Sequence, residues 1–183
     1  RRAGARMLVL PDDTMGGLIS GGCLEGDLLE HARRVRETGV PALVQYDHRG
    51  EDDIVWGLGL GCAGAVDVWL ERVDAQNAGP LAWLGAWNDA RENGALALAL
   101  SGARAGQRRA LGAASGYAGP FASPEIDNAL RECLTTGAGR RFAAGPGQQA
   151  VIEVARAPLR LALFGAGPDA LPLARIAREL GWA

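Results

Sequence analysis

The chain has 183 residues, of which 48% are hydrophobic and 22% charged, and its net charge is −2 at pH 7, a composition typical of soluble globular proteins. The basic residues form no block or tail, so the sequence favours neither a nucleic-acid surface nor an anionic membrane surface. The longest purely apolar run, ALALAL at 95–100, is far shorter than the ~20 residues that cross a membrane as a helix.

The three cysteines, Cys23, Cys62 and Cys133, are odd in number and widely spaced. This pattern is not that of a disulfide framework, so it predicts a reducing, cytoplasmic setting. No secretory leader is visible. The chain begins with Arg1 and not with methionine, so we expect its natural N-terminal segment to be missing.

The first third of the chain predicts a hairpin over 6–22, with turn chemistry in PDDT, followed by a helix from 24 that closes at 39–41. A short strand follows at 42–46. An acidic run at 51–53 and a glycine-rich stretch then lead into another strand that ends near Val73. The helix from residue 24 is supported by the helical spacing of its apolar residues, which places them on one face.

The middle of the chain predicts two helices and two strands. Helical spacing begins at Pro80, and residues 94–101 read as a strand buried on both faces. Ser123 and Pro124 are typical of a helix start, and residues 150–155 read as a strand. The alternation indicates an α/β or α+β protein. We expect an α/β fold whose N-terminal domain, residues 1–155, contains a mixed sheet.

The last segment, LRLALFGAGPDALPLARIARELGW, predicts a buried strand, a glycine turn and a helix. Gly165, Gly167 and Ala170 fit the pattern G-x-G-x-x-A of a Rossmann-like domain, in which glycine lets a pyrophosphate approach a helix N-terminus. The acidic residue that would bind a ribose should follow ~20 residues later, beyond the end of the chain. We therefore expect residues 159–183 to be the first βα unit of an incomplete dinucleotide-binding domain.

The stretch ISGGCLEGDLLEHARRV places a cysteine among glycines directly before a helix. Helical N–H groups favour the thiolate of Cys23, whereas Glu25 and Asp27 oppose it, and the sequence leaves the outcome of that contest open. The neighbouring glycines predict that a bulky ligand can approach the backbone. Cysteines that only pack in a core are the ordinary alternative, and this is our prediction for Cys133.

A structural zinc site is not favoured. Cys23, Cys62, His31 and His48 could in principle converge, but zinc ligands are usually paired at short spacing, and no such pair occurs. His31 falls on the apolar face of its helix, which predicts a core histidine. The acidic run at 51–53 reads as a solvated turn. Common hydrolase and NTPase motifs are absent from the sequence.

Three segments resemble those of the xanthine dehydrogenase accessory factor (XdhC/CoxI) family: ISGGCLEGDLLEHA, YDHRGEDDIVWGLGLGCAGAVDVWLERV and LALFGAGPDALPLARIARELGW. The resemblance is dense over residues 5–73 and again over 159–182. It implies a chaperone that binds the molybdenum cofactor, assists its sulfuration together with a cysteine desulfurase, and helps insert it into an apo molybdenum hydroxylase. The cofactor would be molybdopterin or its cytosine dinucleotide form, and a homodimer is compatible with the family.

The resemblance also implies site residues, with Cys23 and Cys62 as contacts to molybdenum or sulfur. The family's two cysteine motifs and the glycine turn together name the cofactor-binding candidates, which are Gly21, Gly22, Cys23, Glu25, Gly26, Gly61, Cys62, Gly165 and Gly167. The expected protein binds and delivers and does not turn over a small substrate. Two alternatives stay open: an NAD(P)-dependent oxidoreductase that uses the GAGPDA turn, and a redox or metal module built on the cysteines.

Overall fold

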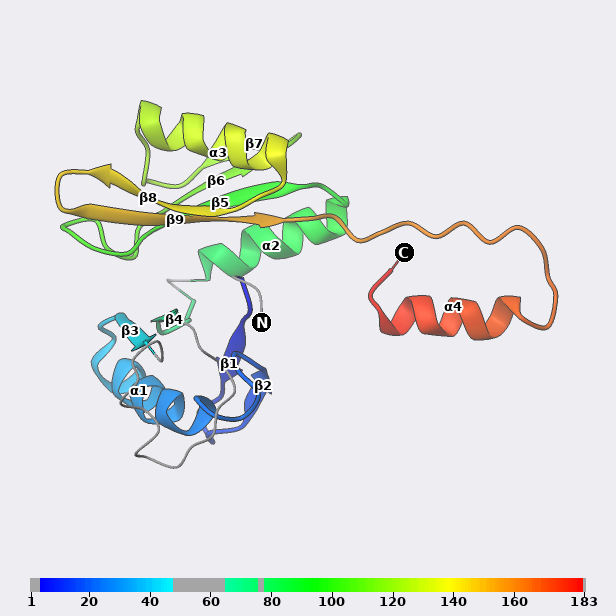
Figure 1. The fold of residues 1–183 in the computed structure, drawn as a ribbon, viewed down its shortest axis with the longest axis horizontal. Coiled ribbons are helices and arrows are strands. Elements are labelled where there is room, and N and C mark those ends of the chain that lie inside the picture. Colours follow the sequence, from blue (N-terminus) through cyan, green and yellow to red (C-terminus); the bar gives the residue numbers. More distant parts are fainter. Residues whose placement is uncertain (1–3, 48–64, 76–77, 183) are drawn as a thin grey trace. The chain divides into compact units, whose positions relative to one another are not determined.

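The computed structural model describes residues 4–47, 65–75 and 78–182, and it divides into two compact units, 1–78 and 79–183 (Figure 1). The boundary predicted between residues 155 and 159 stays a prediction, as does the assignment of 159–183 to a separate domain. No helix in the described ranges is long and apolar enough to cross a membrane.

The first unit contains two small antiparallel sheets and one helix. β1 (Met7–Val9) pairs with β2 (Met15–Gly17), which confirms the predicted hairpin. α1 (Glu25–Thr38) ends at Gly39, whose left-handed conformation lets its N–H reach the Val35 carbonyl. β3 (Ala42–Asp47) pairs with β4 (Ala65–Leu70), so the second strand ends earlier than predicted.

Asp13 joins the β1–β2 turn to α1. Its carboxylate accepts hydrogen bonds from Arg33 at 2.8 and 3.1 Å and from Arg36 at 3.2 Å. Arg36 also donates to the Leu10 carbonyl at 2.9 Å. Asp13 has φ 65°, a left-handed conformation that Asp tolerates better than most residues. Two arginines of the helix therefore hold the turn of the hairpin.

The second unit is built on a five-stranded antiparallel sheet of order β7-β6-β5-β9-β8. It contains α2 (Gly79–Ala90), β5 (Gly94–Ala99), β6 (Arg108–Gly112), β7 (Gly116–Ala118), α3 (Pro124–Thr136), β8 (Arg140–Gly145) and β9 (Gln148–Ala155). Sequence reasoning missed β6, β7 and β8, whose short sequences lack clear alternation. It also expected a mixed sheet, whereas every strand pairing in the described residues is antiparallel.

The two faces of β5 are buried by different helices, which confirms the predicted double burial. Ala95, Ala97 and Ala99 belong to the core beneath α3, together with Cys133. Leu96 lies in a second cluster with Trp87 of α2, and α2 and α3 lie on opposite faces of the sheet (Figure 1). The small alanines allow α3 to pack closely against the sheet. Ser123 caps α3 by accepting a hydrogen bond from the Ile126 N–H at 3.2 Å, as its sequence predicts.

The last segment differs from the prediction in one respect. The expected buried strand at 159–164 is not formed, and Phe164 is 98% exposed. A strand requires the hydrogen bonds of a neighbouring strand, and no part of the described chain pairs with these residues. The glycine turn and helix are present, with α4 spanning Ala170–Glu179. The assignment of this segment to a Rossmann-like unit therefore stays a prediction.

Candidate functional site

Cys23, the cysteine predicted to contact the cofactor, lies in an open loop before α1. We call this loop, together with the first two residues of α1, the glycine notch (residues 20–26). The helix is capped by Leu24, so Cys23 is the residue just before the cap, and it is exposed. A Cβ atom added at Gly21, Gly22 or Gly26 would meet no heavy atom within 4 Å. Gly22 also has φ +112°, a backbone conformation that residues with a side chain rarely adopt. The backbone on both sides of the thiol is therefore accessible.

Glu25 stabilises the backbone of the glycine notch through hydrogen bonds. Its side chain is buried, with 7% of the residue exposed. One carboxylate oxygen accepts the Ser20 N–H at 2.7 Å, and the other accepts the Ser20 hydroxyl and the Gly22 N–H, the latter at 3.0 Å. The Ser20 hydroxyl oxygen in turn accepts the N–H groups of Gly22 and Leu24, at 3.2 and 3.1 Å. These bonds satisfy the main-chain N–H groups of Ser20, Gly22 and Leu24.

The hydrogen bonds of Glu25 outweigh the cost of its burial. Burial raises the pKa of a carboxyl group, but the Ser20 hydroxyl and the N–H groups of Ser20 and Gly22 lower the pKa of Glu25 to about 2. Glu25 is therefore ionised at neutral pH and oriented toward the loop backbone. Sequence reasoning named Glu25 as a site residue but missed Ser20, whose only signal was a hydroxyl placed shortly before a helix start.

Asp27, the second acidic residue of this helix start, contacts β3. Its carboxylate accepts a hydrogen bond from the Tyr46 hydroxyl at 2.5 Å, and the same oxygen lies 3.6 Å from His31 Nε2. Burial and the Asp27 carboxylate raise the pKa of Tyr46. The prediction of a core histidine is wrong for His31, because 34% of its side chain is exposed. The helix face that holds it is only partly covered.

Several predicted residues lie outside the described ranges: Cys62, Gly61, the rest of the second cysteine motif, His48 and the acidic run at 51–53. The meeting of Cys23 with Cys62 therefore stays a prediction. Cys133 is buried in the core, as predicted, and burial raises the pKa of its thiol. No cluster of three metal-binding side chains occurs among the residues for which the structure gives positions.

The glycine turn before α4 keeps part of its expected geometry. Gly165 has φ +123° and open space where a Cβ would lie. A Cβ at Gly167 would lie 2.6 Å from Asp169 Oδ1. Asp169 is the cap residue of α4, but its side chain makes no capping hydrogen bond. The turn belongs to the second unit and the glycine notch to the first. Binding of a dinucleotide at Gly165 and Gly167 stays a prediction.

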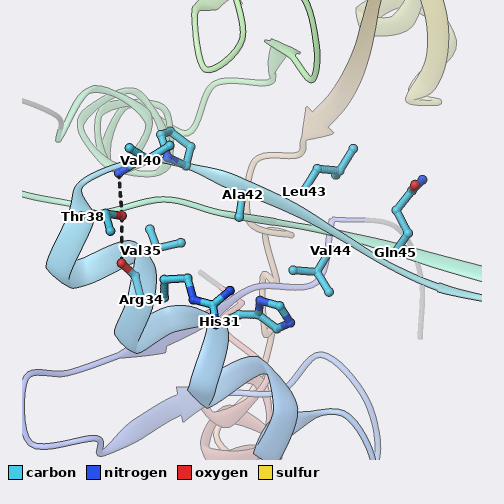
Figure 2. Close-up of a pocket in the computed structure, with 10 residues that line it drawn as sticks. His31, Arg34, Val35, Thr38, Val40, Ala42, Leu43, Val44 and Gln45 are labelled. Carbon is cyan, nitrogen blue, oxygen red and sulfur yellow. Dashed lines mark hydrogen bonds between the residues drawn. The ribbon is translucent and has the colours of Figure 1, made fainter.

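A hollow of about 650 Å³ lies between α1 and β3 in the first unit (Figure 2). Its lining comes from the second half of α1, from the connection that follows it and from the start of β3, and does not include Cys23. The lining residues are His31, Arg34, Val35, Thr38, Val40, Pro41, Ala42, Leu43, Val44 and Gln45. Sequence reasoning gave no indication of this hollow, because it depends on how far β3 lies from the helix.

The chain is similar to known proteins along its length. Residues 1–47 match the model of the XdhC and CoxI family. All 183 residues align at 28% identity with a protein of Bacillus subtilis (strain 168) that is named as a probable subunit of xanthine dehydrogenase, covering 53% of it. The whole chain also matches 52% of the crystal structure of a xanthine dehydrogenase from Bacillus halodurans, with a TM-score of 0.74 and 30% identity. The chain thus spans about half the length of these relatives.

Proposed function

Because this chain belongs to the XdhC and CoxI family, we propose that it binds the molybdenum cofactor and assists its sulfuration and insertion into a molybdenum hydroxylase. The proposed partners are an apo-hydroxylase of the xanthine dehydrogenase type and a cysteine desulfurase. The proposed cofactor is molybdopterin or its cytosine dinucleotide form. In this role the protein handles and delivers the cofactor, and the client enzyme performs the redox reaction.

One observation carries the proposal: an exposed thiol stands in a notch whose backbone is open on both sides. Space for a bulky group exists where Gly21, Gly22 and Gly26 lack side chains, and Cys23 offers a soft sulfur donor there. Soft thiolates suit molybdenum and sulfur chemistry. When bound, the cofactor would supply the metal centre that receives a sulfido ligand.

The residues of the notch have different roles in this proposal. Cys23 would contact molybdenum or the sulfur being transferred, while the glycines leave room for the pterin. Glu25 would not touch the cofactor, because its carboxylate oxygens are occupied by Ser20 and Gly22. Its role is to hold the backbone of the notch in one shape. Cys62 and Gly61 stay candidates for a second contact.

The proposal is tested by adding molybdenum cofactor anaerobically to the purified protein and counting retained molybdenum and pterin per chain. We expect near-stoichiometric retention by the wild type and loss in Cys23→Ser and Cys62→Ser. Gly21→Val should also lose retention while folding normally, because its Cβ enters open space and blocks the notch.

Gly16→Val is the matched control, since it adds the same side chain at an open position of the β1–β2 hairpin. Retention equal to that of the wild type in both Cys23→Ser and Gly21→Val would sink the assignment of the notch. Loss of retention in Gly16→Val as well would attribute the effect to the fold.

A further inference from the structure

The hollow between α1 and β3 has a largely apolar floor. Val35 is buried beneath it, whereas Val40 is 65% exposed at its edge. Figure 2 shows Ala42 and Val44 projecting from β3 toward α1, while Leu43 projects the other way. A volume of about 650 Å³ lies within the range of small-molecule sites, which is roughly 300–1,000 Å³. The floor can therefore take the apolar body of a small ligand.

Most polar groups around the hollow already have partners. The Thr38 hydroxyl donates to the Arg34 carbonyl at 2.9 Å and accepts the Val40 N–H at 3.2 Å (Figure 2). Gln45 Nε2 donates to Asp67 Oδ1 at 3.0 Å, which leaves its carbonyl oxygen as an acceptor. These groups shape the rim and offer no positive charge.

Arg34 is different. Its guanidinium makes no hydrogen bond or ion pair with any residue that the structure describes, although α1 also carries Arg33 and Arg36, which both bind Asp13. His31 lines the same hollow one helical turn earlier, with Asp27 near its Nε2 atom. A cation in this setting, beside an apolar floor, complements a ligand with an apolar body and one anionic end.

We propose that this hollow binds a small organic anion, whose apolar body lies on the floor formed by α1 and β3 and whose phosphate or carboxylate lies at Arg34, with His31 beside it. This site uses neither Cys23 nor the notch glycines, so it goes beyond the proposed cofactor role. A second copy of the chain is a poorer occupant, because a two-fold contact through this face would bring two Arg34 side chains together.

The test is equilibrium binding of three probes to the full chain: phenyl phosphate, benzoate and uncharged benzyl alcohol. We expect one or both anions to bind and benzyl alcohol to bind more weakly. Arg34→Gln should weaken anion binding about tenfold or more, because a charge-assisted contact is lost. Arg175→Gln, an exposed substitution on α4, is the matched control and should bind as the wild type does.

Nuclear magnetic resonance locates the probe. The methyl signals of Val40 and Val44 should shift on titration, whereas those of Val151 in β9 should not. Absence of binding by both anions would overturn the proposal, as would equal binding by wild type and Arg34→Gln. Cys23→Ser should bind the probes normally, so a failure of the cofactor proposal and a failure of this one are distinguishable.

Discussion

Glu25 folds back onto Ser20, five residues earlier, and accepts both the main-chain N–H and the hydroxyl of that serine. These hydrogen bonds tie the first turn of α1 to the loop that precedes it. Cys23 lies between Ser20 and Glu25 in the chain and is exposed. The loop keeps its shape although Gly21 and Gly22, which have the most backbone freedom, stand at its centre. Rigidity at the ends and openness in the middle are what a preformed ligand-approach site needs.

Removal of the Glu25 carboxylate should destabilise the first unit. Glu25→Ala removes the acceptor of the Ser20 N–H and hydroxyl and one of the two acceptors of the Gly22 N–H. We expect a loss of about 2 kcal/mol in the free energy of unfolding. Glu25→Gln should lose less, because its carbonyl oxygen still accepts. Urea denaturation measures both. Glu37→Ala, an exposed change on the same helix, should be near neutral; an equal loss there would contradict the role of Glu25.

The contribution of Glu25 should depend on pH. Its pKa is lowered from 4.5 to about 2 in the folded state, so its stabilisation is present above pH 4.5 and disappears as the pH falls toward 2. The difference in unfolding free energy between wild type and Glu25→Gln should therefore shrink across this window. Urea titrations at several pH values measure it. A difference that stays constant down to pH 2 would contradict the prediction.

Neutralising Asp13 should loosen the β1–β2 hairpin. The hydrogen bonds of Arg33 are the main reason why the pKa of Asp13 is lowered, despite an opposing effect of burial. Asn also tolerates the left-handed φ of this position, so Asp13→Asn removes charge with little backbone strain. We expect up to about fivefold faster amide exchange in residues 7–17. Asp89→Asn, an exposed change in α2, should leave these rates unchanged.

Two glycines of the second unit should respond oppositely to alanine. A Cβ at Gly94 would lie 2.3 Å from the ring of Trp87, so Gly94→Ala should destabilise the unit by ~1–3 kcal/mol. Gly85, in α2, has nothing within 4 Å of its added Cβ, so Gly85→Ala should stabilise the helix by about 0.5–1 kcal/mol. Thermal denaturation measures the effect of each substitution. A stabilising Gly94→Ala would contradict the close packing of Trp87 against Gly94.

The two described cysteines should differ in reactivity. Cys23 is exposed, whereas Cys133 is 2% exposed and has a raised pKa because of burial. In a Cys62→Ser background, we expect Cys23 to react with a thiol reagent about a hundredfold faster than Cys133, which reacts only on opening of the core. Stopped-flow labelling followed by peptide mapping measures both rates. Comparable rates in the native protein would contradict the buried position of Cys133.

The predictions that rest on local sequence patterns are the ones that the structure confirms. The cap at Ser123, the end of α1 at Gly39 and the double burial of β5 follow from neighbouring residues, and the structure confirms each of them. The predicted strand at 159–164 is wrong in the described chain, although its residues are apolar enough. Strand formation depends on a partner, and apolar composition does not supply one.

Local patterns predict the end of α1 at Gly39, the start of α3 at Ser123 and the core position of Cys133. The inward orientation of Glu25 toward Ser20, the partial exposure of His31 and the hollow beside Arg34 could not be predicted in this way, because they depend on the fold. Capping and turn chemistry act within a few residues and can be read from the chain. Burial and the pairing of charges depend on which distant segment, here β3, lies against a helix.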